Sequence, residues 1–242
     1  MAIAPVSGQV GGALGSNAAS VSYTFPLSVS VGSLITVTAG ATPYRPFVLG
    51  DCTKTGGTAT ISAFTLDKVQ DGGGVVGGTG QWSAIVTGAG TLTITVTTAA
   101  SNFQFIACNE HTGSWDSTRV LATNGANFSA SGSPSSGNAT SVAAALFVGA
   151  LAVQNNAIVT LTPGGGFTNV YSAVNGTTDI VCARSELLVT IPTTTAASWT
   201  VSPAPGTCQA SVVVYKEAAA APATTPGTLG MWDTSLRILS WF

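Results

Sequence analysis

The segment TLTITVT, residues 91–97, alternates Thr with Leu, Ile and Val and decides the fold class of this chain. Successive side chains of a β-strand point to opposite faces, so this alternation predicts a strand with one buried face and one solvated face. Thr, Val and Ile also favour such a pleated, half-buried surface. The segment therefore predicts an all-β protein.

The same pattern recurs along most of the chain. In the first part it predicts strands at residues 21–25, 34–38, 58–66 and 103–108. In the second part it predicts strands at residues 167–171, 179–184, 187–191, 198–201 and 209–215. The apolar run 142–153 is predicted as a buried strand, because Gly149 interrupts it and Ser- and Asn-rich tracts flank it. Glycine clusters at 71–74, 77–80 and 88–90 predict turns.

An internal echo indicates two similar halves. Residues 92–110 contain LTITVT followed by FQFIACNE, and residues 195–217 contain TAASWTV followed by ASVVVYKE. We therefore expect residues 21–217 to form one antiparallel β-sandwich, jelly-roll or immunoglobulin-like, with halves at about 21–123 and 142–217. The Gly-, Ser- and Asn-rich residues 124–141 are predicted as a long loop between the halves. Two small domains are the alternative.

Both ends of the chain are expected to lie outside this sandwich. Residues 1–20 are small and glycine-rich and predict an extended N-terminal arm. Residues 218–242 predict a Pro/Ala linker and an apolar docking tail. Pro222 and Pro226 favour an extended linker, and ten such residues span about 30 Å, enough to reach a neighbouring subunit.

The end of the tail carries large apolar side chains, each of which gains roughly 1.5–3 kcal/mol when it is fully buried. We predict an assembly interface formed by Met231, Trp232, Leu236, Ile238, Leu239, Trp241 and Phe242. The alternative is that this segment folds back on its own domain.

Composition excludes several classes of function. Only 7% of the 242 residues are charged, and seven basic residues cannot neutralise many phosphates, so nucleic-acid binding is not expected. No apolar run approaches the roughly 18 residues of a membrane span. The opening MAIAPVS lacks the basic and apolar regions of a signal peptide, which predicts synthesis without export. The Thr/Gly/Ser/Val-rich composition is typical of surface-exposed proteins, and a virion component released by host lysis would reconcile the two properties.

The cysteines are Cys52, Cys108, Cys182 and Cys208. No close Cys-x-x-Cys pair predicts a zinc site. One bridge in each half, Cys52–Cys108 and Cys182–Cys208, is the disulfide arrangement that the two-half organisation favours. The alternative is four free thiols that act as small apolar core residues.

No residue set predicts catalysis, a metal site or a cofactor. Glu110 precedes His111, the single histidine, but neighbouring residues of a strand point to opposite faces. No serine lies in a nucleophile-elbow motif, and no pair of carboxylates carries a glycosidase signature. The aromatic side chains that could stack on a sugar are Trp82, Trp115, Trp199, Tyr44 and Tyr171. In β-sandwiches such side chains are more often core residues.

Several motifs resemble those of phage and environmental bacterial β-sandwich proteins of the virion decoration, head-fibre or tail-associated type. They are GSLITV at 32–37, GAGTLTITV at 88–96, CNEHTG at 108–113, LFVGA at 146–150, TPGGGFTNVY at 162–171 and VVYK at 213–216. The resemblance covers roughly residues 30–217 and excludes both ends. It implies a structural protein of a phage virion.

We therefore expect a non-enzymatic virion protein that assembles with copies of itself and with other virion proteins through its arm and tail. The alternative is a carbohydrate- or host-receptor-binding module of a fibre or adhesin, with a host glycan as its partner.

Overall fold

The computed structural model describes residues 2–42, 46–72, 77–129, 131–154, 160–174, 180–204 and 206–219. These residues form an all-β protein with antiparallel sheets, which confirms the predicted fold class and is consistent with a β-sandwich. One short 3-10 helix, Leu49–Asp51, interrupts the strands of this described part. No helix among these residues has the length and apolar character needed to cross a membrane.

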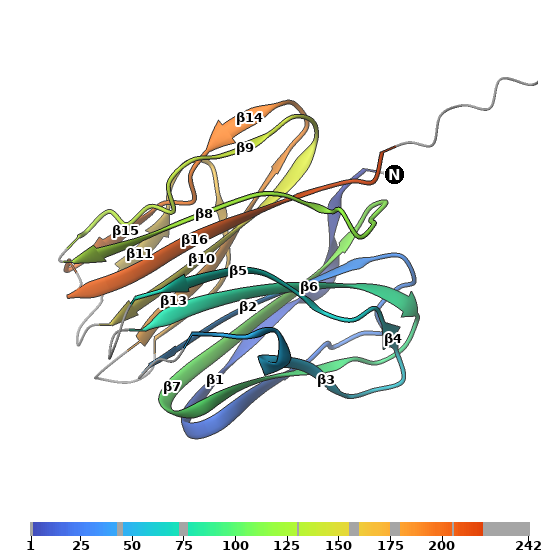
Figure 1. Cartoon of the computed structure of the whole chain (residues 1–242), viewed down its shortest axis with the longest axis horizontal. Coiled ribbons are helices and arrows are strands. Elements are labelled where there is room, and N and C mark those ends of the chain that lie inside the picture. The colour runs from blue at the N-terminus through green and yellow to red at the C-terminus, as the bar shows by residue number, and fades with distance from the viewer. Residues whose placement is uncertain are drawn as a thin grey trace, which may run out of the picture.

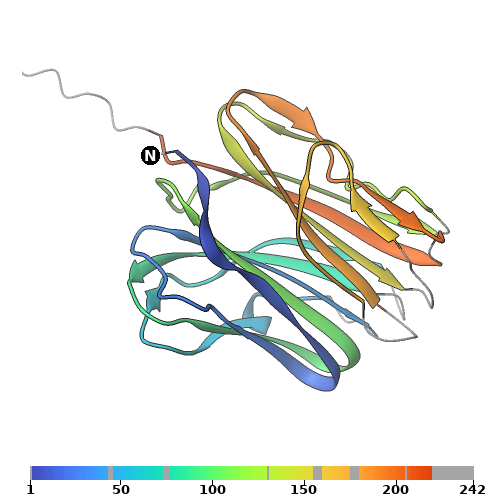
Figure 2. The same cartoon turned by 180° about the vertical axis from the view of Figure 1, so that it is seen from behind.

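The first sheet has the strand order β1-β7-β2-β6-β4, with β3 on β7 and β5 on β6. Its strands are β1 (Ala4–Thr24), β2 (Leu34–Thr42), β3 (Cys52–Gly56), β4 (Thr60–Ile61), β5 (Thr65–Asp71), β6 (Gly78–Gly88) and β7 (Thr93–Thr112). The long strands β1 and β7 curve together (Figures 1 and 2), with a shift in their pairing between Ala18 and Ser20. The curve lets both parts of β7 border one apolar core, to which Ile94 and Ile106 both belong.

The second sheet has the strand order β12-β13-β10-β16-β8. Its strands are β8 (Val120–Ser129), β10 (Ala145–Gln154), β12 (Thr168–Val174), β13 (Ile180–Val189) and β16 (Thr207–Lys216). Two small sheets accompany it: β9 (Ala139–Ser141) with β14 (Thr193–Thr195), and β11 (Thr160–Pro163) with β15 (Trp199–Ser202). Trp199 and Phe147 help to form a second core between the five-stranded sheet and these smaller sheets.

The two large sheets pack against each other (Figure 1), and alternation along the strands gives each sheet two different faces. In β7, Ile106 lies in the first core, whereas Phe105 and Ala107 pack with Cys182 of the second sheet. A separate apolar cluster, which includes Leu34 and Tyr215, joins the sheets elsewhere along their interface. Residues 104–111 of β7 are therefore buried on both faces of the strand.

The predicted N-terminal arm is corrected by the structure. Residues 4–24 form β1, which pairs with β7 from Ala4 opposite Thr112 to Thr24 opposite Thr93. The glycines that indicated flexibility serve close packing instead. A Cβ atom added to Gly12 would lie 2.7 Å from the Tyr171 ring, so this position must stay small.

The predicted loop at 124–141 is also wrong in part, because β8 occupies residues up to Ser129 and β9 lies at Ala139–Ser141. The predicted turn at 77–80 is replaced by the start of β6. A Cβ on Gly80 would meet the Trp82 ring at 2.4 Å, so this glycine makes room for a core side chain. Residues 187–189 continue β13 and do not begin a new strand.

The last described residues lie beside the start of the chain (Figure 1). The backbone N–H of Ala218 donates to the carbonyl of Ser114 at 2.7 Å, and the Thr112 hydroxyl donates to the carbonyl of Ala4 at 3.2 Å. Residues 220–242, which include the linker prolines and all seven predicted interface residues, lie outside the described part of the chain, as does Tyr44.

Candidate functional site

A cleft of about 490 Å³ opens where β1 and β12, the end strands of the two large sheets, lie close together. Its lining is mainly apolar and includes Pro5, Val10, Val170, Leu187 and Leu188. Two polar side chains, those of Asn109 and Glu186, also border it. The cleft therefore combines an apolar wall with a small polar surface.

Irregular strand pairing helps to open this cleft. The pairing of β1 with β7 shifts between Pro5 and Val10, and the pairing of β12 with β13 shifts between Asn169 and Tyr171. Such bulges bend a strand and end its regular ladder, and they are frequent at the edges of sheets. Both walls of the cleft thus carry a bulge.

Glu186 lies at the centre of a buried polar cluster beside the cleft. Its carboxylate accepts hydrogen bonds from Arg184 Nε at 2.9 Å, from His111 Nε2 at 3.0 Å and from Asn109 Nδ2 at 2.9 Å. The four side chains come from β7 and β13, which belong to different sheets. Alternation brings them together, because Asn109 and His111 share one face of β7, and Arg184 and Glu186 share the facing side of β13.

Arg184 connects this cluster to the backbone of the first sheet. Its Nη1 atom donates to the carbonyls of Thr36 at 2.9 Å and Ala107 at 3.2 Å, and its Nη2 atom also contacts the Thr36 hydroxyl. The side chain is fully buried. A buried arginine requires such partners, because an unpaired charge in the interior is costly.

The pKa of Glu186 is set by opposing influences. Burial alone raises the pKa of a carboxyl group, but the neighbouring His111 and Arg184 outweigh burial and hold the pKa of Glu186 well below its usual range. Glu186 is therefore ionised at neutral pH. Its negative charge is satisfied inside the protein by the Arg184 and Asn109 donors.

The arrangement does not assemble a nucleophile around His111. The Nδ1 atom of His111 has no hydrogen-bond partner, and therefore no Ser, Thr or Cys partner, in the described part of the chain. The neighbouring Glu110 points to the other side of β7, as the alternation predicted. It accepts hydrogen bonds from Gln9 at 3.0 Å, Ser33 at 2.6 Å and the Ser30 backbone at 2.7 Å.

A second polar group joins the sheets along β5, β6 and β16. The Tyr215 hydroxyl donates to Asp67 Oδ2 at 2.7 Å, and Arg119 Nε donates to the Ser83 hydroxyl at 2.9 Å. Burial raises the pKa of Asp67, against the lowering influence of Ser83, Thr65, Tyr215 and Arg119. These contacts again serve the joint between the sheets.

The aromatic candidates from the sequence are mostly core residues. Trp82 and Trp199 are buried, and the half-buried Trp115 donates its Nε1 hydrogen to the His111 carbonyl at 3.3 Å. Tyr171 is half-buried beside the end of the cleft's β12 wall. Within the described residues, no group of three or more His, Cys, Asp or Glu side chains is placed to hold a metal ion.

The predicted disulfides Cys52–Cys108 and Cys182–Cys208 are not formed. All four cysteines are free and buried, which corresponds to the alternative of four free thiols. Cys182 pairs with Ala152 and Cys208 pairs with Val153, on opposite sides of β10. Strands two places apart are separated by about 9.5 Å, beyond the roughly 7 Å limit for the Cα atoms of a bridge.

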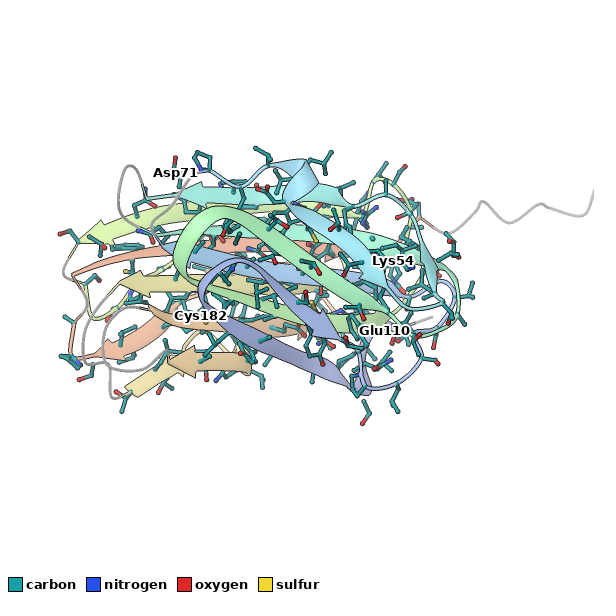
Figure 3. The ribbon with its side chains drawn as sticks, turned by 90° about the horizontal axis from the view of Figure 1, so that it is seen from below. Lys54, Asp71, Glu110 and Cys182 are labelled. Carbon is teal, nitrogen blue, oxygen red and sulfur yellow. The ribbon has the colours of Figure 1, made fainter. Side chains whose placement is uncertain are left out.

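Cys52 and Cys108 both border the first core but lie on its opposite layers. Cys52 pairs with Val96 in the first part of β7, whereas Cys108 pairs with Val37 in the second part, beyond the curve of that strand. Both cysteines belong to one core and are free thiols. Figure 3 labels Cys182 of β13 and Glu110 of β7, which lies two residues after Cys108, and the two labelled residues lie apart in that view.

The sequence did not single out Asn109, Arg184 or Glu186. A signal was present, since Arg184 and Glu186 are charged residues inside an apolar strand of a chain with only 7% charged residues. A charged pair two residues apart on one strand shares a face, and in a sandwich this face can be internal.

No protein-family model matches the chain, and no curated protein or solved structure is significantly similar to it.

Proposed function

We propose that the protein is a non-enzymatic structural protein of a phage virion, of the decoration, head-fibre or tail-associated type. It assembles with copies of itself and with other virion proteins through residues 231–242, named here the tail segment. The phage context is supported by the resemblance of the strand motifs over residues 30–217. The expected location is the virion, after synthesis in the host cytoplasm.

The observation that carries this proposal is the contrast between a closed domain and an apolar tail segment. Both cores of the described domain are complete without it, since their largest side chains, including Trp82, Trp199 and Phe147, are already buried. The tail segment carries seven large apolar side chains, two of them Trp. Such a segment gains most by burial against another surface.

The polar cluster supports a structural role for its residues. Arg184, Glu186 and Asn109 use their hydrogen-bonding groups to join β13 to β7 and β2. The corrected position of residues 4–24 removes the N-terminal arm from the proposed assembly contacts and leaves the tail segment as the clasp.

We further propose that the fold is a jelly-roll or immunoglobulin-like sandwich built from two similar halves. The two cores support this organisation. The first draws on residues between Val21 and Cys108, and the second draws on residues between Ala139 and Val214. These spans support the proposed halves, although Leu121 and Ala122 of the first half also pack against the second core.

The alternative, binding of a host glycan or receptor by a fibre or adhesin module, has less support. Sugar binding of this kind needs exposed aromatic rings, and Trp82 and Trp199 are core residues. A glycan array that shows sugar-dependent binding of the full chain would favour this alternative over assembly.

The proposal is tested by deleting residues 228–242 and measuring the sedimentation of the intact and shortened chains. We expect the shortened chain to keep its circular-dichroism spectrum and thermal unfolding, because both cores lie before residue 219, but to sediment as a monomer while the intact chain forms an oligomer. A matched control replaces Thr224 and Thr225 of the linker by Ser and should assemble normally. An unchanged oligomer after the deletion would refute the tail as a clasp.

A further inference from the structure

We propose that the cleft between β1 and β12 is the surface that receives aromatic side chains of the tail segment from a second copy of the chain. This inference rests on the proposed assembly function and adds the location and chemistry of the receiving site.

The walls of the cleft are suited to an apolar occupant. Val10 and Leu188 are 38% and 41% exposed, although both are large apolar residues. Pro5, Val170 and Leu187 extend the same lining. A volume of about 490 Å³ falls in the range of roughly 300–1,000 Å³ that encloses a compact ligand, so the cleft has room for anchoring side chains rather than for a whole segment.

One polar atom at the wall of the cleft is an unused hydrogen-bond acceptor, which a donor on an apolar occupant would satisfy once the Asn109 side chain turns toward it. Asn109 borders the cleft and is only 2% exposed, and its Oδ1 atom has no hydrogen-bond partner in the described part of the chain. The orientation of this amide follows from its chemistry. Its Nδ2 atom must face Glu186, because an ionised carboxylate only accepts hydrogen bonds. The oxygen is therefore an unused, buried acceptor.

Tryptophan matches both properties of the cleft. Its indole is a large apolar body with one N–H group that donates and cannot accept. The tail segment contains two of them, Trp232 and Trp241. The other apolar side chains of the segment, such as Leu236 and Phe242, would fill the apolar part of the cleft but leave the Asn109 oxygen without a partner.

The length of the linker favours a neighbour's cleft over the chain's own. Ala218 is held at Ser114, and the β1 wall of the cleft begins at Pro5, which pairs with His111 only three residues before Ser114. The eleven residues 220–230 reach about 34 Å when they are extended, as Pro222 and Pro226 favour. Such a linker passes well beyond a cleft near its own starting point and suits a cleft on another copy.

Cross-linking between full-length copies tests this arrangement directly. One copy carries Leu188→Cys and the other carries Trp241→Cys, and the mixture is oxidised under mild conditions. The native thiols do not compete, because all four are buried and burial raises the pKa of Cys108 to about 12 and that of Cys208 to about 11. The control mixture replaces Leu188→Cys by Val48→Cys, an exposed apolar site directly before the 3-10 helix that does not line the cleft.

We expect at least ten-fold more disulfide-linked heterodimer from the Leu188→Cys mixture than from the Val48→Cys mixture, with the linked peptides identified by mass spectrometry. Equal yields would overturn the inference. It would also be overturned if the doubly substituted chain, Leu188→Cys with Trp241→Cys, formed the bridge within one monomer and the mixture formed none.

Two further variants separate this inference from the proposed function. Leu188→Glu should weaken self-association at least ten-fold in sedimentation, whereas Val48→Glu should not. Replacing both Trp232 and Trp241 by Phe should weaken it about five-fold, the loss expected for one hydrogen bond. If all variants associate normally while deletion of residues 228–242 abolishes association, the cleft is not the receiving surface and the assembly function still stands. If the intact chain is a monomer, both proposals are wrong.

Discussion

At the scale of single residues, Arg184 is the side chain on which the joint between the sheets most depends. It lies on β13 and donates to the carbonyl of Thr36 on β2 and to that of Ala107 on β7. It also neutralises Glu186, whose side chain is only 8% exposed. A single substitution here removes an ion pair and two hydrogen bonds to backbone carbonyls of the first sheet.

We predict that Arg184→Met lowers the free energy of unfolding by about 3–5 kcal/mol, because removal of one partner leaves a buried charge uncompensated. Urea denaturation measures this change. The matched control is Lys54→Met, an exposed cation that donates to the nearby carbonyl of Gly57, and it should change stability little. A small effect of Arg184→Met would mean that the buried pair contributes little to the joint.

At the scale of elements, β1 shows how packing overrides local flexibility. Its glycines made residues 1–20 look like an arm, yet they let β1 lie close to its neighbours. Gly11 leaves room for the Tyr23 side chain, and Gly12 leaves room for Tyr171 of the second sheet. The strand therefore contributes both to the first sheet and to the contact between the sheets.

We predict that Gly12→Ala destabilises the protein by about 1–3 kcal/mol, although alanine is normally harmless in a strand. The added Cβ would lie 2.4 Å from the Ile106 carbonyl oxygen, a backbone atom that cannot move aside easily. Gly50→Ala is the control, since a Cβ there meets nothing within 4 Å. Thermal unfolding compares the two variants, and equal midpoints would contradict the close packing of β1.

At the scale of the whole molecule, two apolar cores are joined through an interface that contains ionised groups. Glu186 and Arg184 lie within this interface, as does the hydrogen bond from Tyr215 to Asp67. The stability of the joint is therefore linked to pH. Because the pKa of Glu186 is lowered in the folded protein, its contribution is present above the usual glutamate pKa of about 4.3 and is lost as the pH falls below that value.

We predict that the free energy of unfolding falls between about pH 5 and pH 3, and that the fall is shallower in Glu186→Gln. Urea denaturation at several pH values measures the slope. Asp67 acts in the opposite sense, because its pKa is raised and its contribution to stability is lost as the pH rises through that pKa. It therefore reduces the slope of stability against pH. This reduction is the same with and without the Glu186 carboxylate. Glu217→Gln is the control and should keep the slope of the unchanged protein. If Glu217→Gln and Glu186→Gln gave the same slope, the role of the buried carboxylate would be disproved.

The sequence predicted the elements better than it predicted the site. Alternation of apolar and polar residues is a local property, so β2, β10 and β16 could be recognised from residues 34–38, 142–153 and 209–215. Glycine was ambiguous, because the same residue marks a turn, a flexible segment or a close contact. Only the neighbours of Gly12 and Gly80 in space distinguish these cases.

The cleft and its polar cluster could not be read from the sequence, since Asn109 and Glu186 are 77 residues apart and meet only when the two sheets pack face to face. The sequence by itself determined that the chain is all-β and that residues 231–242 carry seven large apolar side chains, because both follow from residue type and local period. The tertiary structure alone decided that β1 belongs to a sheet, that the four cysteines are buried free thiols and that Asn109 keeps an unused acceptor beside an apolar cleft. These properties depend on strand order and register, which are set by contacts between distant parts of the chain.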